Sequence, residues 1–345
     1  MYIKDLNNLS KKDVMIAGGK GAFLGELIHL SLSFDNTTAM CDQVKIAISV
    51  PSGYVILATG FERFLKETNL IQKLKAQLDN INYEEILSVV KVSEIVRELI
   101  NNKNIPDDIE QEILKNFRKL KSKYVAVRSS STCEDSRVNS WAGELESYLN
   151  VNEDSLLENV KKCWSSLFTP RAILYRHKRC PLKKEGNVAV VIQKMIQAEV
   201  SGVCFTVHPV TEDKNLMVVE AGYGLGGAIV GGKITPDTYI LSKFKKRSTK
   251  FKTELAIIDR NISNQGKMII RGKEGIKEKV VSVSRRKKQK LSDNKLLDLA
   301  KICLKIEKHF KKPQDIEWCL KNGQLYFVQS RPITTLRINF KKKKG

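Results

Sequence analysis

The apolar positions between residues 61 and 117 recur three and four residues apart. This spacing places them on one face of a helix, as is typical of helices that pack against a core. The pair Pro106-Asp107 is typical of a new first helical turn, because proline fits there and a nearby carboxylate stabilises it. The apolar examples are Phe61, Phe64, Leu65, Ile95, Val96 and Leu99. We therefore predict that this region is largely helical.

Two further stretches show helical periodicity. Residues 155–178 are predicted to be helical, with an interruption at Thr169-Pro170 where proline suits a first helical turn. Ser292 is a favourable N-cap for a last helix, because its hydroxyl can accept from a free backbone N–H. The apolar positions predicted on the buried face of that helix are Leu296, Leu297, Ala300, Cys303, Leu304 and Phe310.

Short runs of β-branched residues predict strands. Residues 188–192 form an unbroken run, which is typical of a strand buried on both faces. A strand over residues 124–127 would deliver Arg128 into a polar loop. The other predicted strands cover residues 202–207, 216–220 and 238–241. Because helices predominate in the first half and strands in the second, we predict an α+β fold of two lobes, divided near residues 180–187.

The end of the chain predicts a β-hairpin from Asp315 to Gln329. Side chains alternate between the faces of a strand, so Asp315 and Glu317 share one face. A two-residue turn at Asn322-Gly323 would place Gln329 on the opposite face from these carboxylates. A three-residue turn that starts at Lys321 would instead pair Asp315 with Gln329. Only the three-residue turn gathers the polar side chains, so we predict that turn.

With the three-residue turn, the hairpin would bring together carboxylates, an amide and a guanidinium, which are groups that can bind a metal ion with a polyphosphate. Carboxylate and amide oxygens are ligands that Mg²⁺ prefers, and Arg331 shares the face of Gln329. A plain amphipathic hairpin is the alternative interpretation. The acids Asp315 and Glu317 alternate with the apolar Ile316 and Trp318, which favours a buried polar site.

A glycine turn near the start of the chain holds a lysine. We predict a short strand, then Gly18-Gly19-Lys20-Gly21, then a helix over residues 22–30. The glycines let the backbone around Lys20 approach a ligand closely. The turn is not a Walker loop, because the glycine spacing differs and no Ser or Thr follows the lysine. An ordinary surface turn is the alternative.

A second glycine-rich segment, residues 222–227, contains a literal G-x-G-x-x-G after a predicted strand. A dinucleotide-binding domain also needs a full helix and an acidic residue about 20 positions later. Here Gly231-Gly232 ends any helix early, and the acidic position falls in a lysine-rich run. A loop near a phosphate or an acceptor explains the segment better.

The composition indicates a globular chain with reduced thiols. Its 345 residues are enough for two or three compact units, and 42% of them are hydrophobic. No apolar run reaches the roughly 20 residues that span a bilayer, and the first residues do not resemble a secretion signal. Seven scattered cysteines without a Cys-x-x-Cys pair argue against disulfides or a zinc cluster. We therefore expect a cytoplasmic protein without a membrane partner.

The formal charge is +22, and much of the excess lies in runs at residues 243–252, 285–290 and 341–344. Basic clusters can bind nucleic acid. Only Phe244 and Phe251 interleave with these runs as stacking platforms, and no nucleic-acid motif accompanies them. A basic surface that attracts nucleotides is therefore favoured over a nucleic-acid interface.

Several stretches, in order along the chain, resemble the ATP-binding domain of the phosphoenolpyruvate synthase and pyruvate phosphate dikinase family, which also includes rifampicin phosphotransferases. Together they cover nearly the whole chain. The stretches are GGKGAFLGEL, VPSGYVI, VRSSSTCEDS, SWAGELESYLNV, TPRAILYRH, VIQKMIQAEVSGVCFT, EAGYGLGGAIVGGKITPDTY and PQDIEW…YFVQSRPIT.

This resemblance implies an ATP-grasp fold, in which the nucleotide lies between two lobes. Residues 1–185 would form the N-terminal lobe, with an insertion at 33–49 close to Lys20. Residues 186–336 would form the C-terminal lobe, and residues 337–345 a basic tail.

The resemblance also implies roles for individual residues. Lys20 and Arg128 would hold the phosphates of ATP, and Arg331 would neutralise charge on the transferring phosphoryl group. The residues that would cover the phosphates or line the adenine pocket are Ser140, Ala142, Gly143, Gln193, Met195 and Ile196. Those that would hold Mg²⁺ are Asp315, Glu317 and Gln329.

The implied function is an ATP-dependent, Mg-dependent kinase module that passes phosphate to a histidine on a separate carrier domain. None of the four histidines, His29, His177, His208 and His309, lies in the setting of the family's carrier histidine. We therefore expect the carrier and the pyruvate or phosphoenolpyruvate site on a separate partner. His208, where the family often has asparagine, is the histidine of most interest. Two alternatives are an ATP-binding regulator or remnant without turnover, and a nucleic-acid-binding protein.

Overall fold

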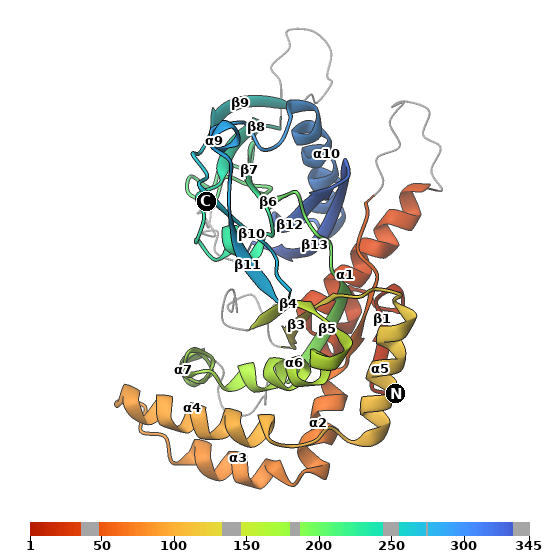
Figure 1. Ribbon diagram of the computed structural model, residues 1–345, viewed down its shortest axis with the longest axis vertical. Coiled ribbons are helices and arrows are strands. Elements are labelled where there is room, and N and C mark those ends of the chain that lie inside the picture. The colour runs from red at the N-terminus through yellow and green to blue at the C-terminus, as the bar shows by residue number, and fades with distance from the viewer. Residues whose placement is uncertain (36–47, 133–145, 180–186, 244–254, 274, 334–345) are drawn as a thin grey trace, which may run out of the picture. The chain divides into compact units, whose positions relative to one another are not determined.

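The computed structural model describes residues 1–35, 48–132, 146–179, 187–243, 255–273 and 275–333. Contacts divide the chain into two compact units (Figure 1). The first unit draws on residues 1–38, 49–196 and 271–277, and the second on the remainder. The lobe limits that the resemblance implies, at residues 185 and 186, stay a prediction.

The first unit is built on a five-stranded sheet whose neighbouring strands are all antiparallel. In spatial order the strands are β1 (Ile3–Asp5), β2 (Gly53–Ile56), β5 (Val188–Lys194), β3 (Val125–Ser131) and β4 (Ser147–Val151). β5 is central, and its first six residues are buried. The strand predicted from its unbroken apolar run is therefore confirmed.

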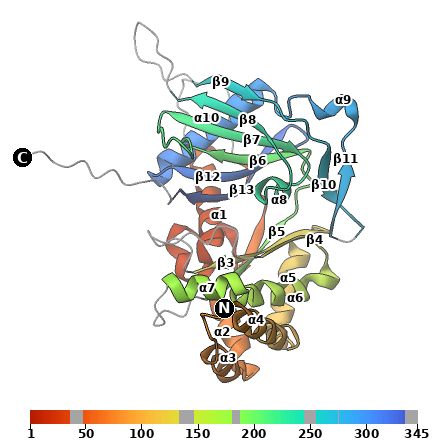
Figure 2. The same ribbon diagram turned by 90° about the vertical axis from the view of Figure 1, so that its left-hand side faces the viewer.

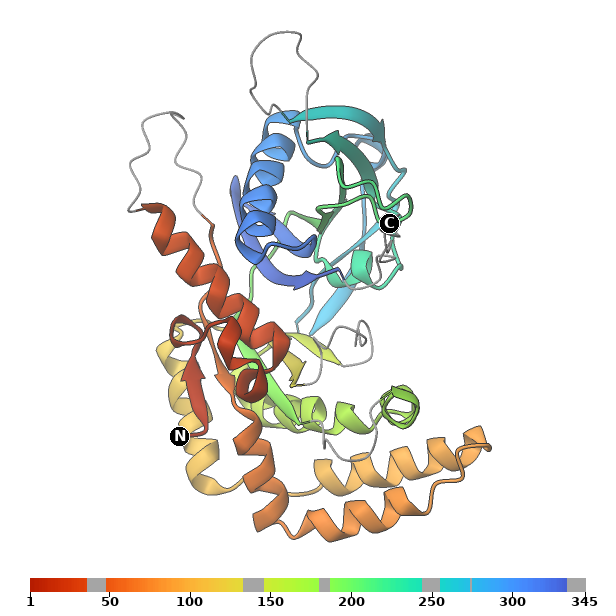
Figure 3. The same cartoon turned by 180° about the vertical axis from the view of Figure 1, so that it is seen from behind.

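Helix α1 (Val14–Asp35) covers one face of this sheet (Figure 3). Its Ala17 and Leu24 pack with Val55 of β2 and Val191 of β5, and all four side chains are fully buried. The 3-10 helices η1 (Leu6–Asn8) and η2 (Lys11–Asp13) lead from β1 into α1.

The opposite face of the sheet carries the larger core of the first unit. Phe61, Phe64 and Trp164 meet at its centre, where the Phe64 and Trp164 ring centroids are 4.9 Å apart. Helices α3 and α4 lie side by side in this unit (Figure 1). The helices that contribute to this core are α2 (Ala58–Glu67), α3 (Leu70–Asp79), α4 (Ile86–Asn101), α5 (Asp107–Lys119), α6 (Glu153–Ser165) and α7 (Pro170–Arg179), with the 3-10 helix η3 (Ser166–Phe168) before α7.

The second unit contains a six-stranded antiparallel sheet, whose strands follow one another in Figure 2. In spatial order they are β13 (Gln324–Pro332), β12 (Gln314–Lys321), β6 (Val200–Phe205), β7 (Leu216–Tyr223), β8 (Asp237–Ser242) and β9 (Ala256–Asn261). Helix α10 (Asp293–Phe310) covers one face, where its Cys303 lies fully buried beside Cys204 of β6. The remaining elements are α8 (Gly227–Val230), the ribbon strands β10 (Lys267–Arg271) and β11 (Ile276–Val280), and α9 (Val283–Arg286).

The α+β class is confirmed, and so are the helices between residues 61 and 117. Pro170 is the first residue of α7, as predicted, whereas Pro106 is the N-cap of α5 and lies one residue before its first turn. In the described ranges, the model contains no helix with the length and apolar character required to cross a bilayer.

Two local predictions were wrong. Arg128 lies inside β3, which extends to Ser131, and not in a polar loop after it. The buried face of α10 also differs, because Leu297, Leu304 and Phe310 are only half-buried. The side chains that reach the core from that helix are Leu296, Leu299, Ala300, Ile302, Cys303 and Ile306. In both cases the burial of the side chains depends on elements that are distant in the sequence, which local periodicity does not report.

Candidate functional site

The glycine turn interrupts α1, because Gly18 has φ 68° and ψ 170°. Only glycine adopts this left-handed conformation readily. The turn lies directly on β3, since a β-carbon at Gly18 would be 2.2 Å from Ser130 Oγ and 2.3 Å from the Ser130 carbonyl oxygen. The predicted break is confirmed at Gly18 alone, because the helix already begins at Val14 and residues 19–21 are helical; the break brings the half-buried Lys20 beside β3.

The Ser130 hydroxyl fastens this turn to the strand. It donates to the Ala17 carbonyl at 2.9 Å and accepts from the Gly21 amide at 3.2 Å. Both bonds are buried, and Ser130 has no exposed surface. One side chain of β3 therefore holds the backbone on both sides of Lys20.

Arg128 shares the face of β3 that carries this turn. Its side chain is two residues from that of Ser130, so the two point the same way. The register pairs Arg128 with Val191, which belongs to the cluster beneath α1. Arg128 is only 9% exposed. Lys20 and Arg128, the two predicted phosphate-binding residues, are thus brought to one face of one sheet.

The other face of β3 is anchored by Glu146. Its carbonyl accepts from the Ser129 amide at 3.2 Å and from the Ser129 hydroxyl at 2.7 Å. Its carboxylate binds Arg97 at 2.9 and 3.1 Å and accepts from the Tyr148 hydroxyl. Burial and this carboxylate raise the pKa of Tyr148. The sequence analysis missed this anchor, because its members lie far apart along the chain.

The predicted adenine-binding residues follow the central strand. Gln193 is buried, and its side-chain amide donates to the Pro51 carbonyl at 3.1 Å. The Met195 amide donates to the Tyr124 carbonyl at 3.1 Å, while Met195 and Ile196 remain half-buried. Their role in binding adenine stays a prediction. Three further predicted residues, Ser140, Ala142 and Gly143, lie outside the described residues.

The predicted three-residue turn of the C-terminal hairpin was wrong. Lys321 pairs with Gln324, so the turn has two residues, Asn322 and Gly323. Both have positive φ, 49° and 73°, as a type I′ hairpin turn requires. A regular hairpin with this turn would have put Gln329 on the face opposite the carboxylates.

A β-bulge restores the polar face. The register shifts between Glu317 and Trp318, so that Glu317 pairs with Gln329 and Asp315 with Arg331. A bulge adds one residue to one strand, and this reverses which side chains share a face. The four predicted residues therefore lie on one face of the sheet, although by a different route.

An ion pair between Arg331 and Asp315 lies on this polar face. Arg331 donates to Asp315 Oδ2 from Nη2 at 2.5 Å and from Nε at 2.8 Å. Burial nevertheless raises the pKa of Asp315, and Glu317 adds to the rise while Arg331 opposes it. These surroundings thus make the carboxyl of Asp315 a weaker acid than it is in water.

Glu220 of β7 is a member of the polar face that the sequence analysis did not select. It pairs with Val203, which in turn pairs with Glu317, so the two carboxylates stand in one row across the sheet. Burial and the neighbouring Asp315 raise the pKa of Glu220. Its position directly before the glycine-rich segment was the available signal.

The donor set of this face suits a hard divalent cation bound together with phosphate. Within the described ranges, no three His, Cys, Asp or Glu side chains converge as a closed metal site. Mg²⁺ does not need such a cage, because it usually takes one or two carboxylates and fills its other positions with water and phosphate oxygens. Glu317 and Asp315 with the Gln329 amide fit that pattern.

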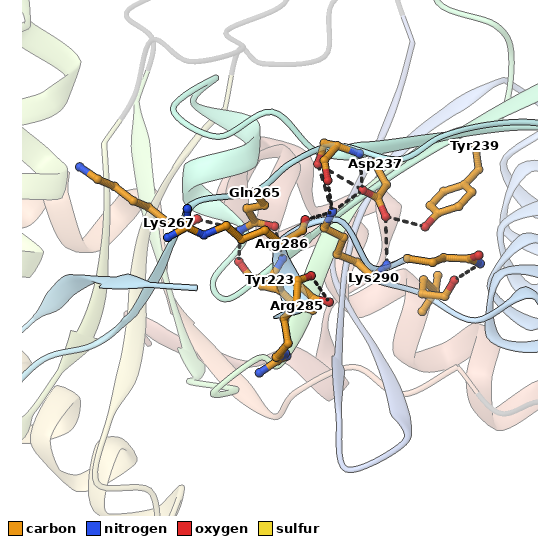
Figure 4. A network of polar contacts seen from close by, with 11 residues as sticks. Tyr223, Asp237, Tyr239, Gln265, Lys267, Arg285, Arg286 and Lys290 are labelled. Atoms are coloured by element: carbon orange, nitrogen blue, oxygen red, sulfur yellow. Dashed lines mark hydrogen bonds and ion pairs between the residues drawn. The ribbon is translucent and has the colours of Figure 1, made fainter. Parts of the chain in front are cut away.

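The glycine-rich segment 222–227 is held by a buried polar network (Figure 4). Gln265 accepts from the Tyr223 amide at 2.8 Å and donates to the Tyr223 carbonyl at 3.0 Å. Gly224 has φ 91°, and a β-carbon there would be 2.4 Å from the Ile269 carbonyl oxygen. Only the four-residue α8 follows, so this is not a dinucleotide-binding unit.

Asp237 is the centre of the same network. It is fully buried and forms an ion pair of 2.7 Å with Lys290. It also accepts from the Ser263 amide at 2.9 Å and from the Tyr239 hydroxyl at 2.8 Å. Lys290 belongs to one of the basic runs, so that run is not a purely solvent-exposed surface.

Lys243, in another basic run, is also internal, since it binds Glu307 at 2.8 Å with only 7% of its side chain exposed. His208 has a structural role, because its Nδ1 accepts from the amides of Val210 and Thr211. The ring of His177 stacks on that of Tyr83. These contacts give structural roles to Lys243, His208 and His177, whose roles the sequence alone did not decide.

Comparison with known proteins supports the same interpretation. Residues 14–345 match the family model described as "Pyruvate phosphate dikinase, AMP/ATP-binding domain". The chain is 39% identical over its full length to a probable phosphoenolpyruvate synthase of Methanocaldococcus jannaschii, of which it covers 28%. It is 40% identical over 96% of its length to a probable phosphoenolpyruvate synthase of Archaeoglobus fulgidus, covering 41% of that protein.

A third relative, rifampicin phosphotransferase of Bacillus cereus, is 35% identical over 97% of the chain. The chain covers 36% of that protein, so it spans less than half the length of each of these three relatives. The family match itself extends over nearly every residue, including the glycine turn, β3 and the C-terminal hairpin. The chain therefore belongs to the pyruvate phosphate dikinase AMP/ATP-binding domain family.

Proposed function

We propose that this chain is a Mg-dependent ATP-grasp phosphotransferase module, which binds ATP and transfers a phosphoryl group to a histidine on a separate carrier domain. The observation that carries the proposal is the bulged hairpin, which puts Glu317 opposite Gln329 and Asp315 opposite Arg331. The family match supports AMP or ATP as the ligand.

The first unit carries the groups that we propose to hold the nucleotide. In the first unit, Lys20 and Arg128 hold the phosphates, and the half-buried segment at Met195 and Ile196 meets the adenine. Phosphoryl transfer is catalysed mainly by positioning and by stabilising charge on the transferring group. Lys20 and Arg128, two cations on one face of the sheet, are suited to positioning the phosphates.

In the second unit, Glu317 and Gln329 hold Mg²⁺, with Asp315 as a third oxygen donor. When bound, Mg²⁺ would neutralise charge on the phosphate oxygens. Arg331, fixed by its two bonds to Asp315, directs a guanidinium towards the transferring group. The carrier histidine and any pyruvate or phosphoenolpyruvate site belong to a partner in this proposal, and the cytoplasm is its proposed location.

Calorimetric titration with ATP, with and without Mg²⁺, tests the proposal. We expect Mg-dependent binding, loss of binding in Lys20→Ala and Arg128→Ala with the fold retained, and a raised Mg²⁺ requirement in Glu317→Gln. Lys288→Ala, an exposed change in a basic run, is the matched control and should bind normally. Normal binding by both cation variants would refute the site.

Product analysis then separates an enzyme from a regulator. Formation of phosphohistidine on an added histidine-carrier domain would support transfer. The nucleotide product would be ADP if only the γ-phosphoryl group moves, or AMP with free phosphate if the β- and γ-phosphates move together and water then releases one of them. Binding without any turnover in that mixture would instead support a non-catalytic ATP-binding regulator. If binding to nucleic acid proved tight, salt-sensitive and indifferent to ATP, the basic runs would define the function instead.

A further inference from the structure

The contact between β3 and the glycine turn is closer than packing alone requires. Gly18 approaches the backbone of Ser130 so closely that no side chain fits at that position, and its φ of 68° excludes most residues in any case. The Ser130 hydroxyl then uses both its donor and its acceptor capacity on this turn, at Ala17 and Gly21. These two backbone partners flank Lys20.

The backbone of Arg128 lies at a fixed distance from that of Ser130, because both residues belong to β3. Two residues along a strand advance about 7 Å and return the side chain to the same face. Every residue from Val125 to Ser131 is buried, and the strand is paired on both edges, with β5 and β4. The position of Arg128 is thus set by the sheet, whereas that of Lys20 depends on the turn.

We propose that Ser130 is a positioning residue that fixes Lys20 relative to Arg128, so that the two cations form a single polyphosphate-binding unit. This inference rests on the proposed function of Lys20 and Arg128. Ser130 itself contacts neither phosphate nor metal in this proposal. It acts by fixing the turn before a ligand arrives, which removes an ordering cost from the binding of a polyphosphate.

The strand offers a matched control in Ser129. Its hydroxyl is likewise buried and donates one bond, to the Glu146 carbonyl at 2.7 Å, but on the opposite face. Ser129→Ala and Ser130→Ala therefore remove the same atom from adjacent buried positions. Both should lower stability, while only Ser130→Ala loosens the turn that carries Lys20.

The test is calorimetric titration of the full chain and both variants with ATP and with AMP, after circular dichroism has shown that they are folded. The ratio of ATP affinity to AMP affinity reports the contribution of the β- and γ-phosphates to binding. A substitution that only lowers the stability of the fold should leave this ratio unchanged. We expect the ratio to fall about tenfold in Ser130→Ala, because that change removes both hydrogen bonds that hold the turn. It should remain at the wild-type value in Ser129→Ala.

A second variant covers the case in which Ser130→Ala fails to fold. Ser130→Cys keeps a weak donor and acceptor in the same place, and should lower the ratio by a smaller factor. An unchanged ratio in a folded Ser130 variant, or an equal fall in Ser129→Ala, would overturn the inference while leaving ATP binding intact. Failure of the unsubstituted chain to bind ATP would instead overturn the proposed function, and this inference with it.

Discussion

Replacing Lys290 with methionine removes an ammonium group that is fully buried against Asp237 while keeping most of the side-chain volume. The ammonium also donates to the carbonyls of Ser263 at 2.6 Å and Arg286 at 3.1 Å. Methionine can replace none of these bonds. Asp237 would then keep its charge in the interior without its cation.

The magnitude follows from what is left behind. Breaking a buried ion pair on one side typically costs about 3–5 kcal/mol, because the remaining charge is uncompensated. Asp237 retains donors at the Ser263 amide, the Lys290 amide and the Tyr239 hydroxyl, which soften the loss. We therefore expect about 3 kcal/mol for Lys290→Met, at the lower end of that range. For Asp237→Ala we expect about 5 kcal/mol, because that change leaves the buried ammonium without its counter-ion and these three donors without an acceptor.

The assay should report on the second unit alone, since a chain of two units need not unfold in a single step. Hydrogen exchange measured by mass spectrometry along a urea series gives the stability of peptides from β7 and β8. Lys288→Met is the control, because Lys288 is exposed two residues away. The reasoning fails if Lys290→Met and Lys288→Met lower protection equally, or if Lys290→Met costs more than Asp237→Ala.

Three shorter predictions concern the site and the turns beside it. Burial and Asp315 raise the pKa of Glu220 above its usual 4.5. A carboxyl whose pKa is raised in the folded state stabilises the fold fully at pH below 4.5. That stabilisation is lost as the pH rises through the folded-state pKa. Glu220→Gln should therefore flatten the decline of the urea midpoint across this window; an unchanged slope would contradict the charge coupling. Gly323→Ala should cost about 1–2 kcal/mol in urea unfolding from backbone strain alone, since φ is 73° and no atom lies within 4 Å of the new β-carbon. Gly18→Ala should lower ATP affinity in calorimetry at least as much as Ser130→Ala, because its new β-carbon would push the turn off β3; normal affinity would show that the close approach is dispensable.

The C-terminal hairpin shows how much of the candidate site could be predicted from the sequence. Alternation correctly paired the faces within each strand, and Asn322-Gly323 is a strong turn signal. The error lay between the strands, because Val328 enters as an extra residue between Phe327 and Gln329. An extra residue changes no local propensity, so only the partner strand reveals it. The four residues share one face as predicted, but the reason given for it was incorrect.

Burial of charge was less predictable than secondary structure. Lys290 stands among other basic residues, and nothing in that run marks it as internal. Its partner Asp237 lies 53 positions away. The same holds for Glu146, whose partner Arg97 lies 49 positions away on α4. Periodicity reports local faces, whereas such pairs depend on how distant elements pack.

The two faces of the six-stranded sheet distinguish structural from functional charge. On the face covered by α10, Asp237 is surrounded by donors and a cation, so its charge is fully paired. On the opposite face, burial and Asp315 raise the pKa of Glu220, and burial and Glu317 raise that of Asp315 against the lowering effect of Arg331.

A sheet selected for stability alone would not retain this second arrangement, because apolar side chains of similar volume would avoid the repulsion. Mutually opposed carboxylates that an added cation would relieve are typical of sites that bind one. The raised pKa values of Glu220 and Asp315 therefore support our proposal that a metal ion and phosphates bind on the face of Glu317. It also predicts that a cation bound there will stabilise the second unit more than the first.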